Sequence, residues 1–242
     1  MDVHARRLAE ELADELQQVF GAGLTALVVF GPHVPDDHDH VPATDDDPLQ
    51  TLALVERLEF AHLEACAARR RRWTRLGLAT PLLFSGDDFV RSLDAFPLEF
   101  GAIINRHAVI RGRDPFGELL VRPDDLRRAC EVQARSHVLH LREGYIEASG
   151  DPSAIDRLVA DSAPALAALL ANLALLDGRT TTDPGGLARH AAGITGAPAS
   201  VFATVLTGGA SRVPTADASR LFPGYLAAME ALAAAVDRRS HA

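Results

Sequence analysis

The chain contains no lysine. All 24 basic residues among its 242 positions are arginine. A protein without lysine cannot form a Schiff base through a side-chain amine, and it lacks the lysine with which P-loop proteins hold phosphate. Because the chain is also rich in alanine, we attribute the exclusive use of arginine to coding bias in a GC-rich genome, not to selection for guanidinium chemistry.

The chain also lacks a long hydrophobic run, and we expect no secretory leader. The longest apolar stretch, residues 163–176, is interrupted by Asn172 and flanked by Asp161 and Asp177. It does not reach the roughly 20 residues that cross a bilayer. The N-terminus becomes charged at once and has no apolar core of a secretory signal. We therefore expect a cytoplasmic protein with no membrane partner.

Cysteine is scarce, and the common phosphate and hydrolase motifs are absent. Cys66 and Cys130 are too few and too far apart for a disulfide framework or a zinc site, so we expect two small buried residues. No Gly-rich phosphate loop or Gly-x-Ser-x-Gly motif is present. The net charge of −9 repels polyanions on average, so we do not expect a nucleic-acid partner.

The N-terminal half alternates between helical and extended patterns. We predict helices over 3–20 and 59–76, the second with Phe60, Leu63, Ala67 and Trp73 on its apolar side. A short helix should open at Asp87. Extended segments are predicted at 24–30, 51–55, 80–84, 97–104 and 108–111. This alternation predicts an α/β domain over residues 1–116.

The C-terminal half has a helical pattern throughout. Pro123 and the acidic residues after it suit the first turn of a helix, whose dipole favours negative charge there. The predicted helices are 123–149, 153–177, 184–193, 198–207 and 215–238. The second of these is apolar nearly all round its middle, which places it inside a bundle. We predict an all-α helical bundle over residues 117–242.

Three segments of the N-terminal half resemble a known family. They are Val28-Val29-Phe30-Gly31-Pro32-His33, Arg91-Ser-Leu-Asp-Ala-Phe-Pro-Leu-Glu-Phe100 and Arg106-His-Ala-Val-Ile-Arg-Gly-Arg-Asp-Pro115. In this order of elements they resemble the bacterial nucleotidyltransferase-like proteins of the DNA polymerase beta-like superfamily. The resemblance implies that the turn with Gly31 and His33 approaches a nucleoside triphosphate. It also implies a ligand cleft between the two domains, and carboxylates on alternate strand residues that hold Mg²⁺.

The chain departs from that family pattern where the chemistry would occur. Pro32 stands in place of the expected serine, which removes a hydroxyl and a backbone N–H. Leu49 and Thr51 align with the paired carboxylates, and Ala102 aligns with the third. Mg²⁺ would then lack an oxygen shell. We therefore expect a degenerate site that acts in nucleotide or small-molecule binding or in regulation.

The loop between the first two strands leaves two alternatives open. Residues 33–50 hold six aspartates and three histidines. Asp36, Asp37, His38 and Asp39 could replace the lost metal ligands, and a two-residue shift brings in Asp47 as a catalytic acid. The protein would then be an active, metal-dependent nucleotidyltransferase with Mg²⁺ and a nucleoside triphosphate as cofactors. Otherwise the segment is a solvated loop that charge repulsion keeps extended.

Several other side chains have two readings. Glu99 is either a surviving acid on a strand or the ion-pair partner of Arg106. The arginines of 69–72 either bind phosphate or form a wetted face. His137 is either a base facing the domain interface or a buried, hydrogen-bonded residue of the core. A third function class is a structural or antitoxin-like module that binds a partner protein or forms a homo-oligomer.

Overall fold

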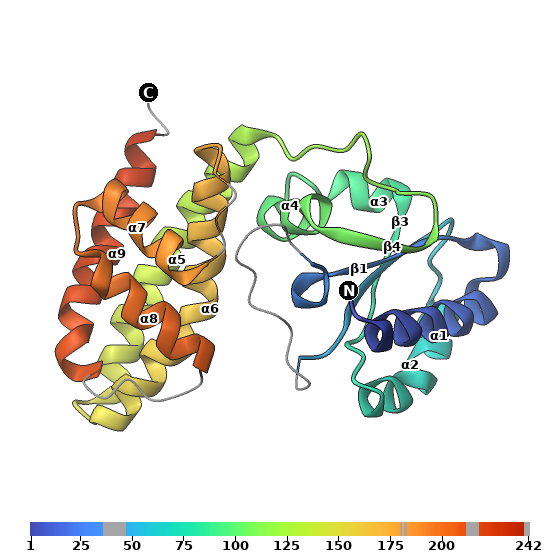
Figure 1. The fold of residues 1–242 in the computed structure, drawn as a ribbon, viewed down its shortest axis with the longest axis horizontal. Coiled ribbons are helices and arrows are strands. Elements are labelled where there is room, and N and C mark those ends of the chain that lie inside the picture. The colour runs from blue at the N-terminus through green and yellow to red at the C-terminus, as the bar shows by residue number, and fades with distance from the viewer. Residues whose placement is uncertain (36–46, 180, 182, 212–217, 240–242) are drawn as a thin grey trace. The chain divides into compact units, whose positions relative to one another are not determined.

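The computed structural model describes residues 1–35, 47–179, 181, 183–211 and 218–239 (Figure 1). It divides into two compact units, Met1–Val121 and Arg122–Ala242, whereas the sequence places the boundary after residue 116. The described elements of the first unit are α1 (Val3–Phe20), β1 (Leu24–Phe30), β2 (Gln50–Val55), α2 (Phe60–Arg75), β3 (Leu82–Ser85), α3 (Gly86–Arg91), α4 (Pro97–Asn105) and β4 (His107–Gly112). A 3-10 turn, Gly31–His33, follows β1.

The four strands form one mixed sheet in the order β3-β2-β1-β4. β1 pairs antiparallel with both β2 and β4, and β2 pairs parallel with β3. The carboxyl end of β1 therefore lies beside the amino end of β2, where Phe30 is opposite Gln50. This register brings the turn after β1 next to the first residues of β2.

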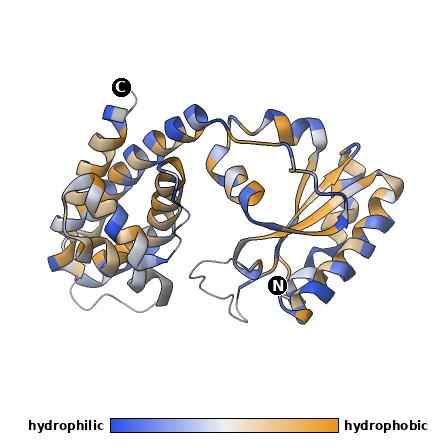
Figure 2. Ribbon diagram, turned by 45° about the horizontal axis from the view of Figure 1, so that its top comes forward, coloured by the Kyte–Doolittle hydropathy of each residue, from blue (hydrophilic) through white to orange (hydrophobic). Residues whose placement is uncertain are grey.

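Helices cover both faces of this sheet (Figure 1). Leu27 and Val29 of β1 point toward α1 and α2, where they pack with Leu12 and Trp73. The alternate residues of β1 pack on α3 and α4, because successive strand side chains face opposite sides. Figure 2 shows the corresponding hydrophobic colour along the strands.

Aromatic rings fill the second face. Phe89 of α3 contacts Phe84, Phe100 and Phe116, with ring centroids 4.8 to 5.9 Å apart. Tilted and edge-on aromatic pairs of this kind add to the hydrophobic stabilisation. The sheet therefore has a hydrophobic core on each side.

Two predictions for this unit are wrong. Residues 97–104 form helix α4, not a strand, and bury Pro97, Phe100, Gly101 and Ile103 at helical spacing. On α2, only Cys66 and Trp73 are buried, whereas Phe60 and Leu63 are 74% and 42% exposed. Cys66 and Trp73 therefore mark the packed side of α2, and Phe60 and Leu63 lie away from it.

The second unit is a bundle of α5 (Pro123–Ala148), α6 (Pro152–Leu176), α7 (Pro184–Thr195), α8 (Ala199–Ser211) and α9 (Ala218–Arg239). Helix α6 contacts each of the others. By length and composition alone α6 could cross a membrane. The length of its longest apolar run, residues 163–176, did not predict this. Its leucines 166, 169, 170 and 173 are fully buried in the bundle, as in a core helix.

The structure thus has a mixed α/β unit followed by an all-α bundle. This is the predicted fold class.

Candidate functional site

The turn after β1 depends on glycine at position 31. Gly31 has φ +78°, a left-handed conformation that side chains other than glycine rarely adopt. A Cβ built on Gly31 would lie 2.9 Å from Oε1 of Gln50. The backbone of this turn and the amide of Gln50 are therefore in close contact, at the point where β1 ends and β2 begins.

His33 ties the turn to the residues before β2. Its Nε2 lies 2.8 Å from the backbone oxygen of Asp47, whereas its Nδ1 is buried and has no hydrogen-bond partner in the described structure. His33 also lies close enough to Asp2 to help lower the pKa of that carboxyl group, although the main cause is the hydrogen bond from the Ala5 amide. The turn thus has one ring nitrogen without a partner.

Arg106 holds the other side of the turn. Its Nε donates to the backbone oxygen of Val34 at 3.0 Å, and its Nη2 donates to the same oxygen. Arg106 directly follows α4, so a contact 72 residues apart in sequence places a guanidinium beside the turn. Neither Gln50 nor this role of Arg106 was predicted, because a lone polar residue at the end of an element has no distinctive local pattern.

The two residues of the β2 region that align with the family's carboxylates are buried in the core. Leu49 and Thr51 are 2% and 1% exposed, and Leu49 packs in the core beneath α1 and α2. A carboxylate at either position would be buried. If the alignment is shifted by one residue, Gln50 and Leu52 take the two carboxylate positions, and their side chains are an amide and an aliphatic group. In neither register does β2 offer a pair of carboxylates.

The third expected position also lacks an acid. Ala102 lies in α4 and not on a strand, so its alignment with a strand carboxylate is wrong. The strand parallel to β2 is β3, whose four residues carry no carboxylate either. Asp87 and Asp88 follow β3 at its carboxyl end. Because β3 is parallel to β2 and β2 is antiparallel to β1, these aspartates lie at the opposite end of the strands from Gly31.

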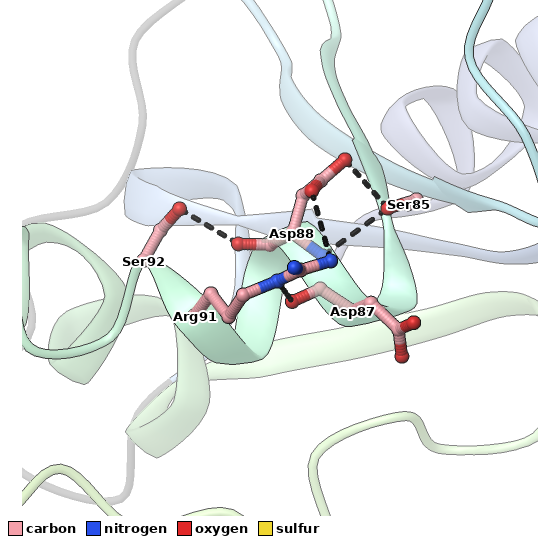
Figure 3. Close-up of polar contacts among 5 residues, drawn as sticks. All are labelled: Ser85, Asp87, Asp88, Arg91 and Ser92. Atoms are coloured by element: carbon pink, nitrogen blue, oxygen red, sulfur yellow. Dashed lines mark hydrogen bonds and ion pairs between the residues drawn. The ribbon is translucent and has the colours of Figure 1, made fainter.

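Those two aspartates serve the start of α3 (Figure 3). Ser85 accepts from the backbone N–H of Asp88 at 3.1 Å, and its hydroxyl lies 2.6 Å from Oδ2 of the same residue. Arg91 lies 3.5 Å from Oδ1 of Asp88. These contacts cap a short helix, and we assign no catalytic role to them.

The described structure does not place Glu99 in a site, and it does not test the predicted metal ligands. Glu99 is exposed in the first turn of α4, where negative charge suits the helix dipole, and it makes no ion pair with any described residue. Asp36, Asp37, His38 and Asp39 lie outside the described residues. Within the described ranges, no three His, Cys, Asp or Glu side chains group together so as to hold a metal ion.

The remaining candidates have structural partners. In the arginine run of α2, Arg72 pairs with Glu15 at 3.0 Å, and the same carboxylate accepts from the indole of Trp73 at 2.8 Å. Arg69 and Arg72 line a hollow with Glu11, Asp14 and Glu15, whose charge disfavours phosphate. His137 is buried and bonded to Tyr225, as expected of a core histidine. Cys66 and Cys130 are buried and free.

Comparisons with known proteins bear on the fold. No protein-family model matches the chain, and no curated protein matches it. Among solved structures, the chain is similar to spectinomycin adenyltransferase AAD(9) from Enterococcus faecialis, which was crystallised with ATP and spectinomycin. The TM-score is 0.57 at 10% sequence identity, over 96% of this chain and 98% of that one. The likeness thus covers both units, and the chain has a nucleotidyltransferase-like fold followed by a helical bundle.

Proposed function

We propose that this protein uses a nucleotidyltransferase-like fold to bind a nucleotide or another small ligand, and that it does not catalyse metal-dependent nucleotidyl transfer. The observation that carries this proposal is the composition of β2 beside the Gly31 turn. Gln50, Thr51 and Leu52 stand at its start, so neither face of the strand presents a carboxylate.

Nucleotidyl transfer needs that charge. The phosphates of the substrate are neutralised by divalent ions, which also position the attacking hydroxyl. Mg²⁺ binds carboxylates and phosphate oxygens and accepts few substitutes for them. A glutamine amide supplies one neutral oxygen, and the side chain of leucine supplies none. Loss of the metal therefore removes the catalytic step while leaving other means of holding a ligand.

The groups that remain at the turn are suited to binding. The guanidinium of Arg106 is held beside the turn by the Val34 carbonyl. The Gln50 amide lies against Gly31, and the buried Nδ1 of His33 lacks a partner among the described residues. Guanidinium and amide groups hydrogen-bond phosphate and ribose oxygens without a metal.

The test is a thermal-shift panel of the full chain with the four nucleoside triphosphates, each with Mg²⁺ and with EDTA. A ligand that binds only the folded state raises the melting temperature. We expect a rise of the same size in Mg²⁺ and in EDTA, reduced in Gln50→Ala but not in Gln18→Ala. Gln18 is a matched control because it is exposed on α1. A rise that requires Mg²⁺ would contradict the proposal, and no rise at all would favour a scaffold role.

A second candidate is an active enzyme that takes its metal ligands from the aspartates and histidines between His33 and Asp47. The observation in its favour is that Nε2 of His33 lies 2.8 Å from the backbone oxygen of Asp47, so both ends of this segment lie beside the Gly31 turn. This alternative predicts that Asp36→Ala abolishes Mg²⁺-dependent turnover without changing the melting temperature. Asp87→Ala, at the opposite sheet edge, is the matched control and should leave turnover unchanged.

A further inference from the structure

The helical unit has an open cavity of its own, with charged side chains in its lining. It has a volume of about 820 Å³ and is lined by residues of α7 and of the segment that follows α6. This is within the range of pockets that hold small molecules, and it is far larger than a single bound water or ion needs. Helices α6 and α7 pack against each other within the bundle, so the cavity belongs to one unit (Figure 1).

The end of α6 places two charged side chains at this cavity. Gly178, with φ +68°, turns the chain after α6 so that the Arg179 amide bonds back to the Ala174 carbonyl at 2.8 Å. This is the usual closure of a helix by a glycine in the left-handed conformation. As a result, Asp177 and Arg179, on either side of that glycine, both line the cavity.

His190 of α7 presents a buried nitrogen to the same cavity. The residue is 9% exposed, and its Nε2 has no hydrogen-bond partner among the described residues. Oδ2 of Asp177 lies 3.3 Å away. No hydrogen bond joins these two atoms in the described structure, so the carboxylate is a close neighbour of Nε2 that does not satisfy it. A buried polar nitrogen without a partner costs free energy, so a group that fills this position gains it on binding.

Two arginines line the cavity, and Arg189 is attracted to the nearby carboxylate of Asp183. In the described part of the chain, neither Arg179 nor Arg189 has an ion pair within 4.0 Å. The nearest other acid, Asp183, is occupied as the cap of α7. Both of its oxygens accept hydrogen bonds, from the Gly186 amide at 2.7 Å and from the Thr181 hydroxyl at 2.8 Å. The Gly186 bond is the main cause of its lowered pKa.

We propose that this cavity binds a small phosphate ester that carries a free hydroxyl group. The guanidinium groups of Arg179 and Arg189, which come from separate elements, bind the phosphate. Phosphate suits them better than carboxylate, because one guanidinium can saturate both oxygens of a carboxylate, whereas a phosphate has oxygens for two. The ligand hydroxyl binds beside His190 and donates to the carboxylate of Asp177.

The experiment is a calorimetric titration of the full chain with ribose 5-phosphate, inorganic phosphate, AMP and ribose. We expect ribose 5-phosphate to bind, and the double variant Arg179→Gln/Arg189→Gln to bind it at least about tenfold more weakly. Arg157→Gln is the matched control, because Arg157 is exposed on α6 and outside the cavity. It should bind as the wild type does.

A second variant distinguishes recognition of the ligand hydroxyl from recognition of its phosphate. Asp177→Asn preserves shape but loses the charge that accepts the hydroxyl. We expect it to weaken ribose 5-phosphate binding and to leave inorganic phosphate unchanged. Tighter binding of AMP than of ribose 5-phosphate would identify a nucleotide as the source of the phosphate ester, and the reverse would identify a sugar phosphate. Either order supports the site if binding also depends on Arg179 and Arg189.

Three results would overturn the inference. They are equal affinity of the double variant and the wild type for ribose 5-phosphate, equal affinity of the wild type for ribose and ribose 5-phosphate, and no binding of any phosphate compound at millimolar concentration. The site is independent of the one at Gly31. Gln50→Ala should leave ribose 5-phosphate binding unchanged, so failure of one proposal does not imply failure of the other.

Discussion

The Nε2 atom of His137 lies 2.6 Å from the phenolic oxygen of Tyr225 in the core of the helical unit. That phenol lies 3.0 Å from Ser162 Oγ, which donates to the Val159 carbonyl at 2.7 Å. Because a carbonyl oxygen can only accept, the donor in each of the three hydrogen bonds is determined. Ser162 donates to Val159, Tyr225 donates to Ser162, and the Nε2–H of His137 donates to Tyr225. The network thus joins α5, α6 and α9 and fixes the tautomer of His137.

This arrangement makes stability depend on pH. Burial, with a smaller contribution from His140, lowers the pKa of His137 from 6.5 to about 4. As the pH falls below 6.5, His137 takes up a proton in the unfolded protein, whereas in the folded protein it does so only near pH 4. The free energy of unfolding is therefore highest above pH 6.5 and falls by up to about 3 kcal/mol on the way to pH 4.

Urea denaturation between pH 7 and pH 4 measures this loss. We expect His137→Gln to be less stable at pH 7 but to lose less stability on acidification than the wild type. His4→Gln, at an exposed position near the N-terminus, should follow the wild-type profile. Parallel profiles for the wild type and His137→Gln would show that His137 does not cause the pH dependence.

Gly31→Ala tests the geometry of the turn after β1. A side chain at φ +78° and 2.9 Å from Gln50 is strained, so we expect a loss of about 1–2 kcal/mol in the free energy of unfolding. Gly23→Ala is the matched control. Gly23 does not have positive φ, and its nearest neighbour, Glu56 Cβ, is 4.0 Å from the built Cβ. Equal losses in both variants, measured by urea denaturation, would be evidence against this conformation.

Thr51→Val should stabilise the protein. The Thr51 hydroxyl is buried on β2 and has no hydrogen-bond partner in the described structure, and valine has nearly the same shape. Removing an unsatisfied polar group should raise the free energy of unfolding by about 1 kcal/mol. Thr25→Val provides the contrast, because Thr25 donates to the Leu54 carbonyl at 2.9 Å. If Thr51→Val proves the less stable of the two variants by denaturant midpoint, Thr51 has a partner after all.

The sequence predicts elements well where local chemistry marks both ends. Helix α1 ends just before Gly21, whose φ is +55°, and β1 ends just before Gly31. The segment 97–104 shows why such prediction fails elsewhere. Phe96, Leu98 and Phe100 alternate as in a strand, and the same residues also fit a helix, since a short apolar run carries both periods. Pro97, which suits the first position of a helix, was the signal that decides between them.

The candidate site was harder to predict than the fold. Gly31 and His33 are two positions apart in sequence and could be named from the strand that precedes them. Arg106, which donates to the Val34 carbonyl at the same turn, is 72 positions beyond Val34, and only the tertiary fold brings these two residues together. Likewise, Leu49 and Thr51 were aligned with metal-binding carboxylates because the sequence does not reveal which face of β2 the helices α1 and α2 cover.

Metal binding tests the central claim most directly. Mn²⁺, a paramagnetic substitute for Mg²⁺, can be titrated into the full chain and followed by electron paramagnetic resonance. We expect no saturable site at micromolar concentration, because the turn and β2 supply no carboxylate pair. One or two saturable Mn²⁺ sites that disappear in Asp36→Ala or Asp47→Ala would show that the chain has kept a metal centre, and the proposed loss of catalysis would be wrong.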